Sequence, residues 1–148
     1  MWRSRARASW LFRGWASMSN GEAMIATLDD LRVALEQSWD KDTAYPKARA
    51  EAEKGSSVAQ CWATALVVQD YFGGEILMYH YGNGDKHFWN CLPDGTEVDL
   101  TADQFIGGVV PYPPLETMGV PSRGWNPRYR KLSVRVRERL SAGMGDLI

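Results

Sequence analysis

The apolar segment CWATALVVQDYF limits the fold more than any other part of the chain. It is hydrophobic around most of a helical circumference, so it predicts a buried central helix at about 58–72 that other elements must cover. Ser56 or Ser57 would cap its start. The pair Gly73-Gly74 would end it, because glycine readily adopts the left-handed conformation found after helices. A chain of 148 residues is long enough to bury such a helix in one domain.

Three short strands are predicted after this helix. EILMYHY at 75–81 and KHFWNCL at 86–92 flank GNGD, whose Asn-Gly pair is the strongest short signal for a hairpin. TEVDL at 96–100 follows PDG, which is typical of a type I turn with a glycine bulge. We therefore expect an antiparallel β-meander packed on the central helix.

Helices are predicted on both sides of this unit. Thr27 is a good N-cap for a helix at about 27–39, and Asn126-Pro127 opens another at about 127–141. The inward face of the last helix is expected to consist of Tyr129, Leu132, Val136 and Leu140. The fold class that follows is α+β, with a central buried helix, an antiparallel meander and flanking N- and C-terminal helices.

Two other segments show no regular pattern. Residues 106–125 are rich in glycine and proline and predict an irregular loop. Residues 1–20 are rich in arginine and tryptophan, and Arg13 interrupts their only candidate for the apolar core of a signal peptide. We expect a disordered extension at 1–20 and a single domain at 21–148. A transit peptide or a membrane-surface segment is the alternative for the extension.

The composition excludes several classes of partner. Seventeen basic and 18 acidic residues leave a net charge of −1, which does not favour nucleic-acid binding. No apolar run approaches the ~18 residues of a membrane span. Two cysteines do not make the disulfide framework of a small secreted domain, so we expect a reduced cytoplasmic protein whose oligomeric state stays open.

Cys61 is the first candidate for chemistry. If the central helix starts at Ser57 or shortly after, Cys61 lies in its first turn, where the macrodipole and free amides favour a thiolate and an oxyanion. The alternative is an inert cysteine of the core, since free cysteines are among the most frequently buried residues.

A histidine and an aspartate in the meander strengthen the first interpretation. A three-residue PDG loop sets Trp89 opposite Asp99, so that His87 and Asp99 lie diagonally on one face of the sheet. An aspartate that receives Nδ1–H of the ring would leave Nε2 to take the thiol proton. The alternative is a histidine bonded to a backbone carbonyl beside an exposed aspartate.

These residues resemble known motifs. QCWATAL is similar to the Gly-Gln-Cys-Trp stretch of transglutaminase-like proteins, HFWN to their His-x-Trp-Asn segment, and DGTEVDLT to the strand that supplies their aspartate. The segments SWDKDTAYP, QCWATALVVQDYFGGEIL and HFWNCLPDGTEVDLTADQF resemble a small bacterial family of the YunG type over about 38–105. The resemblance implies a transglutaminase-like or papain-like cysteine core with Cys61, His87 and Asp99 as the triad.

The chain departs from the transglutaminase pattern in two ways. Ala59 stands where that pattern has a glycine, so the loop entering the helix would differ. The chain is also far shorter than a full transglutaminase and has no calcium-binding loop of regular spacing. Amide cleavage, common among bacterial relatives of this core, is therefore a better expectation than protein cross-linking.

Three further residues are candidates for supporting roles. Trp39 would offer its indole N–H to the oxyanion, as a tryptophan does in transglutaminases, or would anchor the core. Gln60 would donate a side-chain N–H to the same oxygen or lie on the surface. Trp89 would form a wall of the site or fill the core.

The sequence thus predicts a cysteine hydrolase or acyltransferase that acts on an amide or peptide and needs no cofactor. One alternative is a catalytically idle binding module that uses the loop at 106–125. The other is a zinc protein, because pairing Gly82 with Asp85 would set His80 opposite His87. The zinc ligands would then be Cys61, His80, His87 and Cys91 or Asp99.

Overall fold

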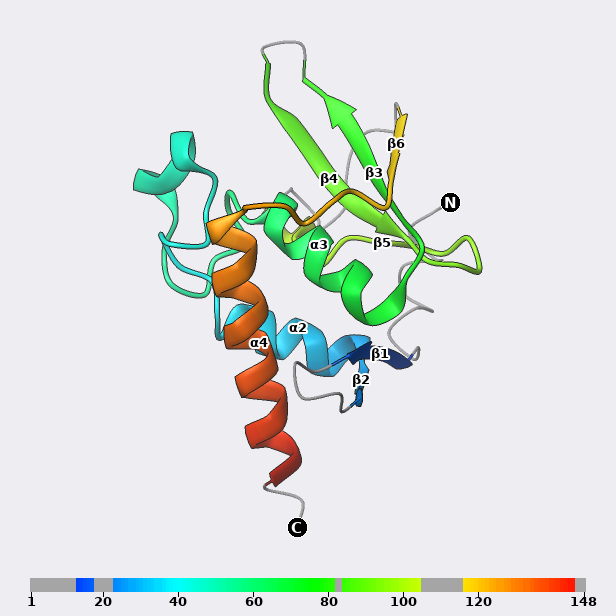
Figure 1. Cartoon of the computed structure of the whole chain (residues 1–148). Helices are drawn as coiled ribbons and strands as arrows, with labels where there is room; N and C mark the ends of the chain where they lie inside the picture. Colours follow the sequence, from blue (N-terminus) through cyan, green and yellow to red (C-terminus); the bar gives the residue numbers. More distant parts are fainter. Residues whose placement is uncertain (1–12, 18–22, 82–83, 105–115, 146–148) are drawn as a thin grey trace.

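The computed structural model describes residues 13–17, 23–81, 84–104 and 116–145, which form an α+β fold as predicted (Figure 1). The elements in chain order are β1 (Arg13–Ser17), β2 (Ala23–Thr27), α2 (Leu28–Glu36), η2 (Pro46–Glu51), α3 (Cys61–Phe72), β3 (Glu75–His80), β4 (Lys86–Cys91), β5 (Glu97–Val98), η3 (Ala102–Gln104), β6 (Glu116–Gly119) and α4 (Pro127–Gly145). The two η segments are short 3₁₀-helices.

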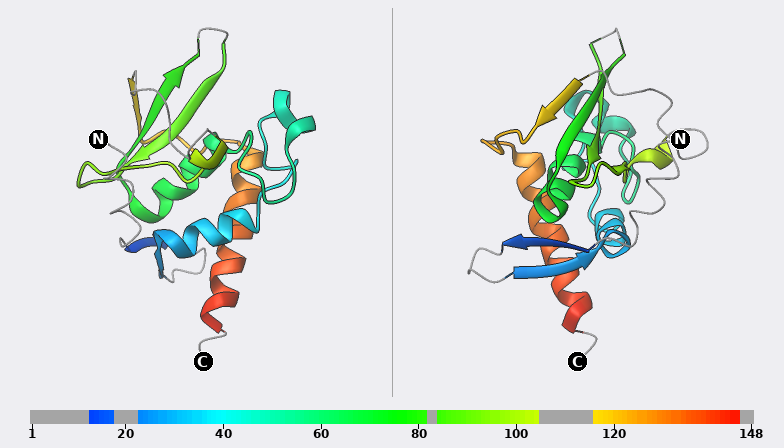
Figure 2. Two further views of the ribbon diagram at one scale, coloured as in Figure 1. Left: turned by 180° about the vertical axis from the view of Figure 1, so that it is seen from behind. Right: turned by 90° about the vertical axis from the view of Figure 1, so that its right-hand side faces the viewer.

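Helix α3 lies at the centre of the fold, between the sheet on one side and α2 and α4 on the other (Figures 1 and 2). Almost every residue after its first turn is buried, as its apolar circumference predicts. The main core around it includes Leu31 of α2 and Leu132 and Val136 of α4. Shortening a fully buried leucine such as Leu132 to alanine costs about 2–5 kcal/mol of stability.

The sheet is antiparallel, with strand order β5-β4-β3-β6. The predicted meander of β3, β4 and β5 is therefore confirmed, and the structure adds β6 on the far side of β3. The prediction of an irregular loop is wrong for Glu116–Gly119, because pairing with β3 orders a short segment that carries no strand signal of its own. The part of that loop at 105–115 lies outside the described residues.

A second, two-stranded sheet joins β1 to β2 in antiparallel register. Strand β1 occupies part of the segment for which the sequence predicts no structure, and it contacts α3. The rest of the predicted extension, 1–12 and 18–20, lies outside the described residues.

Helix α2 begins where its N-cap predicts. The Thr27 side chain accepts from the backbone N–H of Asp30, and the Asp30 carboxylate accepts from the N–H of Thr27, which completes a capping box. The helix ends at Glu36 rather than at Trp39, and the chain then turns so that the indole of Trp39 enters the core.

Helix α3 begins at Cys61, later than predicted, and neither predicted serine caps it. The Ser56 hydroxyl accepts from Val58 N–H in a preceding turn, and Gln60 occupies the cap position without a side-chain cap bond. Between them Ala59 has a φ of 67°, a left-handed conformation that costs about 1–2 kcal/mol for a residue with a Cβ. This turn delays the helix and brings Cys61 to its first position.

The glycine pair ends α3 as predicted. Gly73 has a φ of 74° at the C-cap. Gly74 has a second requirement, because a Cβ there would lie 2.0 Å from the carbonyl oxygen of Cys91 on the neighbouring strand. The helix end and the sheet can therefore approach closely only with glycine at this position.

The two hairpins differ in how well their register was predicted. The PDG loop pairs Leu92 with Thr96, N–H to oxygen at 2.8 Å, as expected. In the GNGD hairpin, however, Tyr81 N–H donates to Asp85, so that Tyr79 stands opposite His87. The predicted register is wrong by one residue, and a shift of one residue sends every side chain of a strand to the other face.

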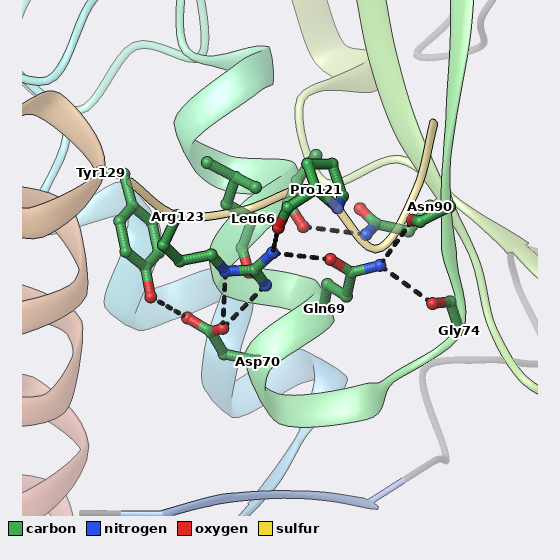
Figure 3. A network of polar contacts seen from close by, with 10 residues as sticks. Leu66, Gln69, Asp70, Gly74, Asn90, Pro121, Arg123 and Tyr129 are labelled. Atoms are coloured by element: carbon green, nitrogen blue, oxygen red, sulfur yellow. Dashed lines mark hydrogen bonds and ion pairs between the residues drawn. The ribbon is translucent and has the colours of Figure 1, made fainter. Parts of the chain in front are cut away.

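A polar network fastens the segment after β6 to α3 and α4 (Figure 3). Arg123 bonds the Asp70 carboxylate at 2.8 and 3.2 Å and the Gln69 side chain at 2.9 Å. Its remaining bonds go to the carbonyls of Leu66 and Pro121. The Tyr129 hydroxyl of α4 donates to the same carboxylate at 2.6 Å, so α3, this segment and α4 share one anchor.

Candidate active site

Cys61 is the first residue of α3 and its side chain is half-buried. The first four N–H groups of a helix lack partners within the helix, and the macrodipole places a partial positive charge there. Both features stabilise negative charge at the position that Cys61 occupies.

His87 projects from β4 and is almost completely buried, with 2% of its surface exposed. Its Nε2 lies 2.7 Å from Oδ2 of Asp99, whose side chain is 5% exposed. The diagonal placement deduced from the PDG register therefore brings these two side chains together. The ring nitrogen is the opposite of the one predicted, since Nε2 rather than Nδ1 meets the carboxylate.

Cys61 is the second group that acts on His87, because it raises the pKa of His87 by hydrogen bonding and by its charge. Because Nε2 is bonded to Asp99, Nδ1 is the ring nitrogen left for the sulfur. Burial lowers the pKa of His87, but the hydrogen bonds to Asp99 and Cys61 and the charges of both outweigh it and raise this pKa to about 9. The imidazolium form of His87 is thus favoured at neutral pH by its contacts with Asp99 and Cys61.

Thr101 holds Asp99 in place, a role the sequence analysis missed. The backbone N–H and the hydroxyl of Thr101 both donate to Oδ1 of Asp99 at 2.9 Å, while Oδ2 is left for His87. Gln104 in turn donates to the Thr101 hydroxyl. The sequence signal is the spacing in DLT, because an aspartate often bonds the backbone two residues on.

Trp89 forms a wall behind the imidazole. Its ring stacks on His87 with centroids 5.6 Å apart, and its indole N–H donates to Glu97 at 3.0 Å. Trp89 is 1% exposed, so it excludes water from that side of the histidine.

Two predicted oxyanion donors are engaged elsewhere. The indole N–H of Trp39 donates to the Thr64 hydroxyl at 2.9 Å inside the core. The Gln60 amide donates to the carbonyl of Asp40 at 3.0 Å and accepts from the Thr43 hydroxyl at 2.8 Å. Trp39 and Gln60 therefore brace the loop and the core that support Cys61.

The structure also contradicts the arrangement on which a zinc site would depend. His80 stands opposite Lys86 rather than His87, and it bonds Glu116 at 3.2 Å. Within the described part of the chain, no group of three or more His, Cys, Asp or Glu side chains could hold a metal ion. A hollow of about 320 Å³ between the end of α2 and α4, lined by residues such as Ser38 and Arg135, contains none of the triad candidates.

A cationic side chain near Cys61 is a second feature that the sequence analysis missed. Arg128 is half-buried at the start of α4, and the charge of Cys61 acts on it. Helix α4 contains several arginines, and only the packing of α4 on α3 distinguishes Arg128 from the others.

The fold and this site define an α+β protein in which a cysteine at a helix start, a buried histidine and an aspartate lie in series. The sequence model of one family, described as YunG protein, matches residues 27–141. The chain belongs to this YunG family.

One relative is the uncharacterized protein YunG of Bacillus subtilis (strain 168), which is 32% identical over 95 residues. The match covers 64% of this chain and 72% of the Bacillus protein. No solved structure matches the chain significantly. Within the described residues, no helix has both the length and the hydrophobicity to cross a membrane.

Proposed function

We propose that this protein is a cytoplasmic cysteine hydrolase or acyltransferase with a transglutaminase-like core, acting on an amide or peptide bond. Cys61 is the nucleophile, His87 transfers the proton and Asp99 orients the imidazole. A cytoplasmic location agrees with a nucleophile that must stay reduced.

The observation that carries the proposal is the buried imidazole between sulfur and carboxylate. A merely structural histidine would be satisfied by Asp99 alone, whereas His87 also bonds a half-exposed thiol at a helix start. Nucleophile, base and orienting group in series form the arrangement that activates a cysteine for acyl transfer.

The reaction starts from the form in which the Cys61 proton already resides on Nδ1 of His87, and the thiolate sulfur attacks the carbonyl carbon. A C–S bond forms while the carbonyl π electrons move to oxygen. The imidazolium then gives its Nδ1 proton to the amide nitrogen, the C–N bond breaks, and the amine leaves a thioester on Cys61.

In the second half, Nδ1 takes a proton from water or from an acceptor amine, which attacks the thioester. The C–S bond breaks, the sulfur leaves as thiolate, and an acid or a new amide is released. Since Trp39 and Gln60 are engaged, the oxyanion is held by backbone N–H groups at the start of α3, that of Cys61 first.

The test uses an acylating or acyloxymethyl ketone thiol probe on wild type, Cys61→Ala and His87→Ala. We expect wild type to be labelled at Cys61, His87→Ala to be labelled slowly, and Cys61→Ala not at all. Cys91→Ala is the matched control, because Cys91 is the chain's other free cysteine and lies at the end of β4, away from the start of α3. Labelling of Cys61 at the rate of Cys91 would favour an idle binding module and reject the proposal.

A further inference from the structure

Two arginines lie near the entrance of the proposed active site. Arg128, the second residue of α4, has its guanidinium carbon 5.7 Å from the centre of the Tyr45 ring. The backbone N–H of Tyr45 donates to the carbonyl of Ala59 at 2.9 Å, in the turn that leads into Cys61. In Figures 1 and 2 the start of α4 lies beside η2, which carries Arg49.

The pKa of Arg128 agrees with this arrangement. Burial lowers the pKa of Arg128, Coulomb interactions with Cys61 and Tyr45 raise it, and the positive charge of Arg49 lowers it. Coulomb interactions weaken with distance and with screening, so the four groups belong to one local cluster. Two like charges held together in this way favour an anion between them.

Neither arginine has a carboxylate partner within the residues that the structure describes. Arg32, Arg123 and Arg135 each form an ion pair with at least one carboxylate. No ion pair is formed there by Arg128 or Arg49. A partly desolvated guanidinium with free N–H groups is suited to bind a carboxylate through two parallel hydrogen bonds.

We propose that Arg128, assisted by Arg49, binds a carboxylate of the substrate next to the bond that Cys61 attacks. The inference rests on the proposed function in one respect, that Cys61 is the nucleophile. The substrate class is then an amide or peptide with an acidic group beside the acyl carbon. The ring of Tyr45 holds the guanidinium in position by a cation–π contact.

The test compares two small alkylating reagents of similar size. Iodoacetate carries a carboxylate, and iodoacetamide carries a neutral amide in its place. Both alkylate a thiolate, so the ratio of their rates at one cysteine cancels that cysteine's own reactivity. We expect the iodoacetate/iodoacetamide ratio to be higher at Cys61 than at Cys91. In Arg128→Gln we expect the ratio at Cys61 to fall about tenfold, as for loss of one charge-assisted contact.

The matched control is Arg130→Gln. It removes the same charge from an exposed position of the same helix, where the guanidinium stacks on Trp125 4.4 Å from the ring centre. We expect this variant to keep the wild-type ratio. Arg128→Lys, which keeps the charge but loses the planar fork, should give an intermediate ratio. Circular dichroism melting of each variant verifies that it is folded.

An unchanged ratio in Arg128→Gln would overturn the inference. So would an equal slowing of both reagents, because Arg128 would then act on the sulfur rather than on an incoming carboxylate. The proposed function fails separately, if the iodoacetamide rate alone is the same at Cys61 and Cys91.

The source of the carboxylate is distinguished with peptidyl chloromethyl ketones that carry Glu or Gln before the ketone. Faster labelling of Cys61 by the Glu probe, lost in Arg128→Gln, assigns the carboxylate to an acidic side chain. Equal labelling by the two probes, with the iodoacetate preference retained, assigns it to a main-chain terminus.

Discussion

Two polar clusters flank helix α3, and they are built in opposite ways. At the C-terminal half, Arg123 uses hydrogen bonds to Asp70, Gln69 and two backbone carbonyls, so that all five of its N–H groups have acceptors (Figure 3). At the start of the helix, the chain of contacts runs from Asp99 through His87 and stops at a half-exposed sulfur. The first cluster is closed, and the second ends at a sulfur that is partly exposed.

The difference separates structure from chemistry. A network in which every guanidinium N–H is paired fixes the packing of the elements that it joins and leaves no donor of that guanidinium for a ligand. In the series Asp99, His87 and Cys61, the last group is a partly exposed thiol, which a substrate would be able to reach. We therefore assign stability to the Arg123 cluster and reactivity to the Cys61 cluster, and the following changes test this division.

The largest expected effect is on reactivity. Replacing His87 with glutamine removes the proton acceptor, and the rate of Cys61 acylation should fall about 10²–10⁴-fold, the usual contribution of a general base. Probe labelling followed by mass spectrometry measures the rate. A variant that stays folded and reacts at the wild-type rate would remove the distinction between the clusters.

The next effect is on stability. Arg123→Met should lower the free energy of unfolding by about 2–3 kcal/mol, because the Asp70 carboxylate and two carbonyls lose charged donors. Urea denaturation measures this loss. Cys61 should keep its wild-type labelling rate in the folded variant, and a large drop in that rate would mean that the two clusters are coupled.

The third test uses pH. Because the folded-state pKa of His87 is raised to about 9, its stabilisation is fully present below about pH 6.5 and is lost as the pH rises through 9. The shift corresponds to about 3 kcal/mol at most. In Asp99→Asn the main favourable partner is lost, so unfolding free energy should decline much less over this range. Equal pH slopes for wild type and variant would contradict the assigned ion pair.

The smallest effect is predicted at Ala59. Glycine adopts its φ of 67° without strain, so Ala59→Gly should raise the unfolding free energy by up to about 1 kcal/mol. Cys61 labelling should be unchanged, because the substitution preserves the turn that places the helix start. A loss of stability would show that the Ala59 side chain makes contacts that outweigh the backbone strain.

The parts of the site that could be predicted depend on local patterns. The PDG turn determines its register within a few residues, so the face shared by His87 and Asp99 follows from the sequence. The position of Cys61 at a helix start was also expected, although the serine caps were wrong, because the turn at Ala59 overrides them.

The parts that could not be predicted depend on distant segments. Strand β6 forms only because β3 offers an edge. Arg123 meets Asp70 of α3, and Arg128 meets Tyr45, only when α4 and the segment before it pack against the rest of the fold. The predicted register of the GNGD hairpin is wrong because the bonded pair that closes its loop is Tyr81 with Asp85. This pair encloses one residue more than the two-residue loop expected for an Asn-Gly turn. The ring nitrogen that meets Asp99 depends on the orientation of His87, which strand parity does not determine.

The most direct test is the pH dependence of alkylation by iodoacetamide, followed separately at the two cysteines. At about pH 6 an unperturbed thiol is almost entirely protonated. We predict that wild-type Cys61 reacts much faster than Cys91 there, and that His87→Gln abolishes the difference. Identical profiles for Cys61 and Cys91 in the wild-type protein would contradict the account.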